Sequence, residues 1–342
     1  MVGGVPVGGG APVSVQSMTK TDTRDSRATI RQIKELERAG CEIIRVAVPD
    51  SEAAQALKPI KKASRIPVVA DIHFDYRLAL AALGAGVDGL RLNPGNIRER
   101  DRVTEVVKAA KNRKVPIRIG VNAGSVPVDY RPGHGMARRM VSLALDQVKL
   151  LEDLGFDLIK LSLKAFDIET TVKAYRLAAR LTPYPLHLGI TESGLPREGT
   201  IRSAAGLGIL LYQGIGDTIR VSLTGPPVEE VEVGYEILKS LGLRQRGAVM
   251  VSCPACGRTE ADVTAIAVAV RKVLKEIDKP IKIAVMGFVV NGPGEARDAD
   301  VGIACGKGRC AIFRNGEVFS TVSDAEALPE LIKAIREVAA SI

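Results

Sequence analysis

The stretch TIRQIKELERAGCEIIRV, residues 29–46, contains a helix, its stop signal and a strand in direct succession. Ile30, Ile33 and Leu36 recur at the spacing that places side chains on one face of an α-helix. Gly40 follows, and glycine commonly ends a helix because it adopts the left-handed backbone conformation without steric cost. The stretch therefore predicts an amphipathic helix over residues 29–39 that leads into a strand over residues 42–46.

The same alternation of apolar runs and amphipathic segments extends from residue 13 to about residue 242. Eight runs are predicted to form strands: residues 13–18, 42–46, 67–71, 87–92, 116–121, 158–163, 185–191 and 218–223. Parallel strands return through crossover helices, so eight such units predict an α/β protein with a (β/α)8 TIM barrel. A doubly wound open sheet is the alternative, which the lack of a dinucleotide-binding G-x-G-x-x-G loop disfavours.

The pattern breaks at residues 243–247, Leu-Arg-Gln-Arg-Gly. Beyond the break we expect strands at residues 248–252 and 281–286 and helices at residues 260–277 and 324–340. This arrangement predicts two domains. Residues 1–245 form a TIM-barrel substrate-binding domain, and residues 246–342 form a smaller α/β domain that carries most of the cysteines.

The composition narrows the class of protein. The net charge of +9 is scattered along the chain, and with 4% aromatic residues and no Trp the sequence lacks the stacking platform of a single-strand nucleic-acid binder. A small anionic substrate is the better explanation of the charge, and solubility is the other. The chain shows neither an apolar run long enough to span a membrane nor a signal peptide, so a cytoplasmic protein is expected.

Polar residues follow or end almost every predicted barrel strand. In a TIM barrel these positions meet at the carboxyl-terminal mouth, where catalysis takes place. The candidate substrate-binding residues are Arg45, Asp71, Arg91, Arg118, Asn122, Lys164, Glu192, Arg220 and Ser222. Four arginines and one lysine at one mouth would repel one another unless an anion lay between them, and the guanidinium fork matches phosphate oxygens. The set predicts a diphosphate or a pair of phosphates as ligand. His73 and His187 lie in the same region, either as acid–base groups or as packed core residues.

Four of the five cysteines lie in the last third of the sequence. Cys253 and Cys256 form a C-x-x-C pair directly after a predicted strand, and Cys305 and Cys310 follow downstream. From their spacing the four could make a zinc site or an iron–sulfur site. The fifth, Cys41, lies in a helix-to-strand turn and is expected to be a buried thiol.

Seven motifs follow one another along the chain: VQSMT (15–19), VADIHF (69–74), RLNPGN (91–96), IRIGVNAGS (117–125), GIGDTIRVS (214–222), CPACGR (253–258) and NGPGE (291–295). Together they resemble the 4-hydroxy-3-methylbut-2-enyl diphosphate synthases of the non-mevalonate isoprenoid pathway, in their two-domain bacterial form. The resemblance covers nearly the whole chain.

This resemblance implies an iron–sulfur oxidoreductase of isoprene biosynthesis. The family opens 2-C-methyl-D-erythritol 2,4-cyclodiphosphate reductively and removes a hydroxyl group, using a 4Fe-4S cluster supplied with electrons by flavodoxin or ferredoxin. By the motifs, the nine strand-end residues named above would bind substrate. Cys253, Cys256 and Glu295 would bind the cluster, and Glu295 would be a displaceable, catalytic ligand. A homodimer is implied, and neither a nucleic acid nor a membrane is expected as a partner.

One position departs from the family. Its third thiolate lies in Met-Gly-Cys-Val-Val-Asn-Gly-Pro-Gly-Glu, where this chain has Phe288. Cys305 or Cys310 is then a possible replacement ligand, or Phe288 impairs the site, or the chain is a non-catalytic relative that binds the phosphorylated substrate. A barrel transferase or lyase stabilised by zinc is the alternative from another enzyme class.

Overall fold

The computed structural model describes the whole chain except residues 74, 94–99, 258, 260 and 289–297. The chain divides into two compact units, Met1–Arg244 and Gln245–Ile342. Among the residues that the structure describes, no helix is long and apolar enough to cross a membrane.

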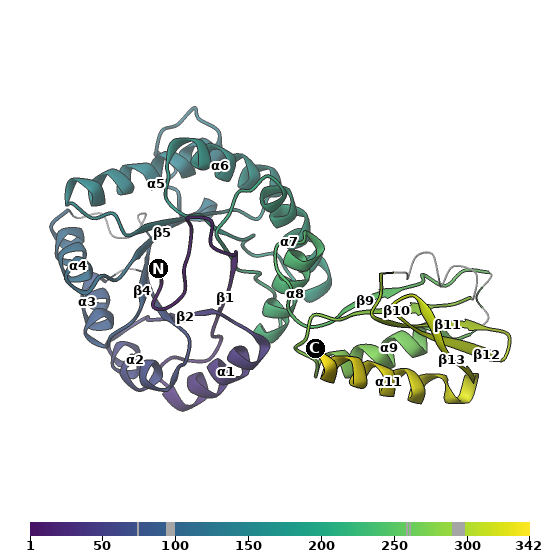
Figure 1. Cartoon of the computed structure of the whole chain (residues 1–342). Helices are drawn as coiled ribbons and strands as arrows, with labels where there is room; N and C mark the ends of the chain where they lie inside the picture. The colour runs from purple at the N-terminus through teal and green to yellow at the C-terminus, as the bar shows by residue number, and fades with distance from the viewer. Residues whose placement is uncertain (74, 94–99, 258, 260, 289–297) are drawn as a thin grey trace. The chain divides into compact units, whose positions relative to one another are not determined.

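The first unit is a ring of parallel strands surrounded by helices (Figure 1). Its strands are β1 (Ser14–Met18), β2 (Ile43–Ala47), β3 (Val68–Ile72), β4 (Gly89–Leu92), β5 (Ile117–Asn122), β6 (Ile159–Lys164), β7 (His187–Leu188) and β8 (Thr218–Ile219). They pair in the order β6-β5-β4-β3-β2-β1-β8-β7, and a parallel bridge between Leu161 and Leu186 joins the two ends. The predicted TIM barrel is therefore confirmed.

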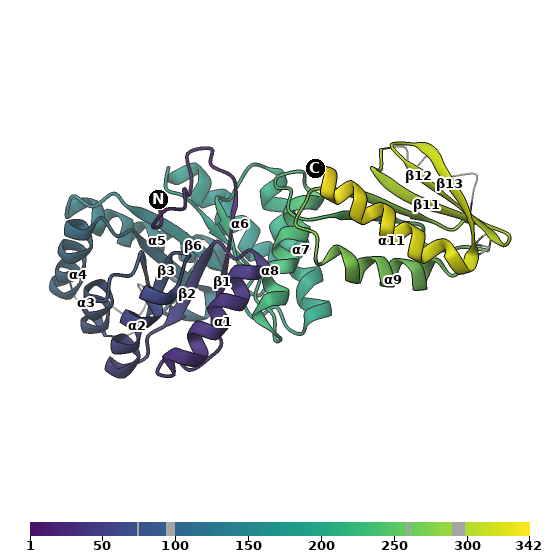
Figure 2. The same cartoon turned by 60° about the horizontal axis from the view of Figure 1, so that its bottom comes forward.

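The helices of this unit are α1 (Ser26–Ala39), α2 (Ser51–Ala63), α3 (Tyr76–Gly84), α4 (Arg100–Arg113), α5 (Met136–Asp153), α6 (Ile168–Leu181), α7 (Pro196–Tyr212) and α8 (Pro227–Ser240), with a short 3₁₀ helix at Ala123–Ser125. Helix α1 begins earlier than predicted because the Asp25 carboxylate accepts a hydrogen bond from the Ala28 N–H and caps it. Gly40 ends it at φ 95°, in the left-handed conformation. Figure 2 shows these helices outside the strands from a second side.

Strands β7 and β8 are two residues long each, shorter than the predicted 185–191 and 218–223. The two residues of β7 pair with those of β8, and those of β8 pair also with β1; beyond them the Arg220 N–H still donates to the Leu188 carbonyl. The polar residues that follow β7 and β8 therefore lie in loop segments at the mouth of the barrel and not in the strands themselves.

Residues 1–13 cover the amino-terminal end of the barrel (Figure 1). Val2 and Val7 pack there against Ile43 and Val69, which point into the barrel near its base. The main core lies between the strands and the helices. Apolar contacts thus close the amino-terminal end of the barrel. The loops that carry function in this fold lie at the opposite end, after the carboxyl termini of the strands.

The second unit is a five-stranded sheet in the order β13-β12-β11-β10-β9. Its strands are β9 (Val249–Ser252), β10 (Lys282–Met286), β11 (Val301–Gly306), β12 (Arg309–Arg314) and β13 (Glu317–Ser323). The pairs β9–β10 and β10–β11 are parallel, whereas β11–β12 and β12–β13 are antiparallel. Helices α9 (Val263–Leu274) and α11 (Asp324–Ser341) cover one face of this sheet, and the α/β character predicted for this part of the chain is confirmed.

Candidate active site

The interior of the barrel is lined by polar and charged side chains. Alternate residues of each strand point inward, and in most TIM barrels these positions hold bulky aliphatic residues. Here the strand residues Gln16, Asp71, Arg91, Arg118, Lys160, Lys164 and His187 are all buried. Burial of charge is costly unless the charges are paired, so their partners decide what the site can do.

Asp71, at the end of β3, holds two of the predicted arginines together. Its Oδ1 lies 3.2 Å from Arg91 Nη1 and its Oδ2 lies 3.5 Å from Arg45 Nε. His73 Nε2 lies 3.4 Å from the same Oδ2. Burial raises the pKa of Asp71, but the charge of Arg45 and the hydrogen bond from His73 outweigh it, so this pKa lies well below its usual range. The carboxylate is therefore ionised and orients both guanidinium groups.

Arg118 reaches across the barrel from β5 to β1. Its Nη1 donates to Gln16 Oε1 over 2.7 Å, whereas Nε and Nη2 are buried with no hydrogen-bond partner in the described structure. Burial, followed by the charges of Arg45 and Arg91, lowers the pKa of Arg118 well below its ordinary value. Two unsatisfied guanidinium donors in a buried site fit an anionic ligand with oxygen acceptors.

Two lysines of β6 add to this positive field. Burial and the charge of Arg220 lower the pKa of Lys164 well below its ordinary value, and Lys164 Nζ lies 3.3 Å from His187 Nε2. Lys160, which pairs in register with Arg118, has a pKa lowered to about 7 by burial and by that neighbouring charge. A bound anion would relieve the repulsion among these cations.

Arg220, after β8, meets a carboxylate that the sequence analysis did not single out. Its Nη2 lies 3.6 Å from Glu230 Oε2, and Lys20 Nζ lies 3.0 Å from Glu230 Oε1. Burial lowers the pKa of Arg220 to about 10, and Glu230 partly offsets this effect. A signal was present in the sequence, because Glu230 lies on the face of α8 that otherwise buries Val231, Tyr235 and Leu238.

Two glycines make room for the cations and were also missed. A Cβ at Gly120 would lie 2.6 Å from Arg91 Nε, and one at Gly189 would collide with Lys164 Nζ and lie 2.6 Å from the Arg220 carbonyl oxygen. Glycine within a strand often marks a close approach of this kind. The strand glycines were therefore a readable signal of where long side chains cross the barrel.

The cations of the barrel interior outnumber its carboxylates. Among the described residues, and apart from the exposed Lys20, six cations face two buried carboxylates, Asp71 and Glu230; the cations are Arg45, Arg91, Arg118, Lys160, Lys164 and Arg220. The structure thus brings together most of the predicted strand-end residues in one electropositive site. An excess of this size indicates a ligand with several negative charges.

The remaining predicted residues lie at the rim. Asn122 ends β5, and Glu192 and Ser222 lie beyond β7 and β8; Asn122 and Ser222 are half-buried, whereas Glu192 is exposed. Ser222 accepts a hydrogen bond from Ser193 through its carbonyl oxygen. Glu192 has φ 57°, the left-handed conformation that costs a non-glycine residue about 1–2 kcal/mol. Backbone strain of this kind is concentrated at functional sites.

The cysteines of the second unit do not form one group in the described part of the chain. Cys253 and Cys256, after β9, are not in a disulfide, whereas Cys305 and Cys310 are buried and joined in a disulfide between β11 and β12. Cys305 and Cys310 lie on the sheet face covered by α9 and α11, and Cys253, just after β9, packs against that apolar cluster and against the one around Met286. Both possible replacement ligands are therefore engaged in a bond to each other.

The described donors complete only half of an iron–sulfur site. Such a cluster ordinarily takes four protein ligands, and among the residues whose placement is described no group of three or more metal-binding side chains occurs. Glu295 and the motif around it lie outside the described residues. Phe288 is described, and its side chain has no atom that binds iron.

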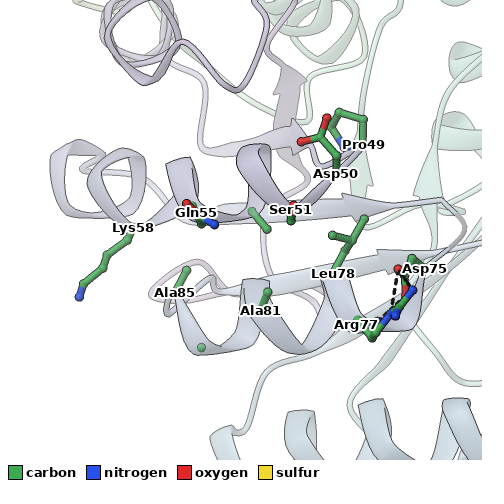
Figure 3. A pocket seen from close by; sticks show the side chains of 12 residues that line it. Pro49, Asp50, Ser51, Gln55, Lys58, Asp75, Arg77, Leu78, Ala81 and Ala85 are labelled. Atoms are coloured by element: carbon green, nitrogen blue, oxygen red, sulfur yellow. Dashed lines mark hydrogen bonds and ion pairs between the residues drawn. The ribbon is translucent and has the colours of Figure 1, made fainter.

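A separate groove of about 920 Å³ lies on the outside of the barrel, between α2 and α3 (Figure 3). It is lined by residues such as Ser51, Gln55 and Lys58 of α2 and Arg77 and Leu78 of α3. Arg77 is paired with Asp75 at 2.9 Å. None of the predicted site residues lines this groove, so it is distinct from the electropositive interior.

Two family models match the chain, one in each of its compact units, Met1–Arg244 and Gln245–Ile342. Residues 1–235 match a family model described as the GcpE TIM-barrel domain, and residues 249–337 match the GcpE protein C-terminal domain. A protein of Dehalococcoides mccartyi named 4-hydroxy-3-methylbut-2-en-1-yl diphosphate synthase (flavodoxin) is 63% identical over 98% of this chain and 96% of its own length. A protein of the same name from Geobacter sulfurreducens is 60% identical over 99% and 97%.

A solved structure, the spore coat polysaccharide biosynthesis protein spsE of Bacillus subtilis, is similar with a TM-score of 0.51. At 11% identity, over 71% of this chain and 72% of that one, it supports the fold alone. The family models and the relatives confirm the resemblance inferred from the motifs. The chain belongs to the GcpE family.

Proposed function

We propose that this chain catalyses the reductive ring opening of 2-C-methyl-D-erythritol 2,4-cyclodiphosphate to 4-hydroxy-3-methylbut-2-enyl diphosphate. The full-length relatives named for that product support the reaction. The observation that carries the proposal is the set of six cations facing two carboxylates in a buried barrel interior. A cyclic diphosphate supplies the missing negative charge.

Each residue of the predicted set has a role in this proposal. Arg118, Lys164 and Arg220 bind phosphate oxygens, because they are buried and their donors are incompletely satisfied within the chain. Asp71 keeps Arg45 and Arg91 directed into the mouth. The rim residues Asn122, Glu192 and Ser222 bind the hydroxyl groups of the substrate.

The cofactor belongs to the same proposal. A 4Fe-4S cluster, when bound, would supply the electrons for breaking a C–O bond, and Cys253, Cys256 and Glu295 would be its ligands. The two cysteines after β9, which form no disulfide, support this, and the relatives' name supports flavodoxin as electron donor. A homodimer is also proposed, from the family resemblance. The second unit would then act in reduction and the barrel in binding.

A second candidate function follows from Phe288. With no thiolate there, and with Cys305 bonded to Cys310, the chain would bind the cyclic diphosphate but assemble its cluster poorly and turn over slowly. The two candidates share the barrel site and differ only in the second unit.

The decisive experiment compares the unaltered chain with Phe288→Cys after anaerobic reconstitution with iron and sulfide. Iron content, binding of the cyclic diphosphate and product formation with reduced flavodoxin are measured for each. Phe319→Cys, an exposed position on β13, is the matched control. Turnover by the unaltered chain supports the first candidate, and turnover restored only by Phe288→Cys supports the second. Failure of both to bind the cyclic diphosphate, or bound zinc in place of iron, would overturn both.

A further inference from the structure

The ammonium group of Lys164 contacts two residues of the neighbouring segment, His187 and Gly189. Its Nζ lies 3.3 Å from His187 Nε2 and directly over Gly189, where a Cβ would collide with it. Residues 187 and 189 both face the barrel interior because side chains alternate along the strand. The histidine therefore contacts the ammonium group, and the glycine leaves the space that the ammonium needs.

The backbone at His187 is tied to the strand that carries Lys164. His187 is fully buried, and its carbonyl oxygen accepts a hydrogen bond from Tyr175 Oη over 2.5 Å. The same Oη accepts a hydrogen bond from the Leu163 N–H on β6. Tyr175 thus fixes the distance between the two backbone segments from which the ring and the ammonium group extend.

The charged groups that most affect this pair are cationic, and the carboxylates of Asp71 and Glu230 lie behind them, paired with Arg45, Arg91 and Arg220. The cations that face Lys164 are Arg45, Arg91, Arg118 and Arg220, from β2, β4, β5 and the segment after β8. His187 faces Arg118, Lys164, Arg45 and Lys160. Burial and then these charges lower the pKa of His187 well below its ordinary value, so the imidazole stays neutral and keeps one nitrogen as an acceptor.

A residue present only for packing would not need this ring. His187 Nδ1 is buried without a hydrogen-bond partner in the described structure, and Lys164 is the side chain bonded to the other nitrogen. An unpaired buried polar atom costs stability, which a phenylalanine or leucine of similar size would avoid. The contact between Nε2 and the Lys164 ammonium group therefore explains why an imidazole occupies this position.

We propose that His187 is the positioning residue for Lys164, accepting a hydrogen bond at Nε2 and aiming the ammonium group at the anionic substrate. This inference rests on the proposed function, because it assumes that an anion binds among the barrel cations. His187 does not touch the substrate itself. It acts by holding the lysine in its charged form and in one orientation, which reduces the entropy lost when the anion binds.

The test measures binding of inorganic pyrophosphate to the full-length chain by calorimetry, from neutral to alkaline pH. In His187→Phe the charged lysine loses its acceptor, so we expect affinity to fall about tenfold, as for the loss of one charged hydrogen bond. The pH above which affinity declines should also move lower, because the lysine loses its proton more easily. His187→Gln, whose amide oxygen can accept the same bond, should restore much of both. His134→Phe, in an exposed loop, is the matched control.

The outcomes separate this inference from the proposed function. If Lys164→Met weakens binding but a folded His187→Phe binds with parental affinity and pH profile, the positioning role is wrong. If Lys164→Met also binds like the parent, the proposed anion site itself is wrong. Should His187→Phe fail to fold, ¹⁵N shifts of the histidine rings in the unaltered chain decide: Nε2 as an acceptor supports the role, and a proton on Nε2 overturns it.

Discussion

The barrel interior contains charged residues where protein cores are ordinarily apolar. Some of these charged groups form ion pairs in the described structure, and Lys160 does not. Asp71 contacts two arginines, and Glu230 contacts Arg220 and Lys20. Lys160, by contrast, has no ion pair in the described structure. The first two groups stabilise the fold by pairing, whereas Lys160 destabilises it so long as it is charged.

Replacing Asp71 with Asn should therefore destabilise the protein. The isosteric amide leaves two buried guanidinium groups without their anion, and we expect a loss of about 3–5 kcal/mol in the free energy of unfolding at neutral pH. The folded-state pKa of Asp71 is lowered, so its contribution is present above the unfolded value near 4 and is lost as pH falls. Urea unfolding at neutral and acid pH checks this. Equal stability at neutral pH would contradict it.

Replacing Lys160 with Met should have the opposite effect. The folded-state pKa is about 7 against an ordinary 10.5, so burial of the charged lysine costs most below pH 7 and the cost disappears as pH rises toward 10.5. We expect Lys160→Met to be about 1–4 kcal/mol more stable at low pH, with an advantage that declines in alkali. Denaturant unfolding across this range, in a buffer without phosphate, is the measurement. A constant difference between the two proteins would rule out the titration of Lys160 as the cause.

At the scale of elements, two glycines of the barrel wall leave space for a charged side chain from a neighbouring strand. Strand β5 supplies Arg118 and, two residues later, Gly120 beneath Arg91. Gly189, after β7, does the same for Lys164. At both positions the missing side chain lets a long cation enter the barrel interior without a clash.

Gly189→Ala tests this arrangement. The added methyl group would collide with Lys164 Nζ and with the Arg220 carbonyl, so we expect a loss of about 1–3 kcal/mol in stability and roughly tenfold weaker pyrophosphate binding. Gly208→Ala in α7 is the matched control, because a Cβ there meets nothing within 4 Å. It should stabilise the helix by about 1 kcal/mol. A Gly189→Ala protein with parental affinity would show that Lys164 is not held at this position.

At the scale of the whole molecule, the chain separates charge binding from sulfur chemistry. The unit Met1–Arg244 holds the cation-rich interior, and the unit Gln245–Ile342 holds Cys253 and Cys256 after β9 and the disulfide between β11 and β12. A ligand recognised only by charge should therefore act on the first unit.

Pyrophosphate at about 100 times its dissociation constant should stabilise the protein by about 2.7 kcal/mol. Hydrogen exchange should locate the added protection mainly in β2, β3, β4, β5 and β6, because their side chains face the cation-rich interior. Sodium chloride at equal ionic strength controls for screening. Added protection mainly in β11, β12 and β13 would contradict the assignment of the anion site to the barrel.

Much of the barrel and its mouth could be predicted from the amino-acid sequence alone. Strand periodicity located all eight strands to within a few residues, and parallel strands necessarily bring their carboxyl ends to one side, so Arg45, Asp71 and Arg91 had to be neighbours. The short β7 and β8 were overestimated, because an apolar run does not show where ladder pairing stops. The motifs identified the family, because strings of that length specify more than a fold.

The amino-acid sequence by itself determined which side chains reach the barrel mouth, because alternation along strands is a local property. Only the tertiary structure decided which of them touch. Arg118 meets Gln16, 102 residues away, and Arg220 meets Glu230 from a helix, because closure of the ring sets which strands and helices face one another. It also decided that Cys305 bonds to Cys310 on the helix-covered face, since hairpin register places two residues opposite each other and no spacing along the chain specifies that register.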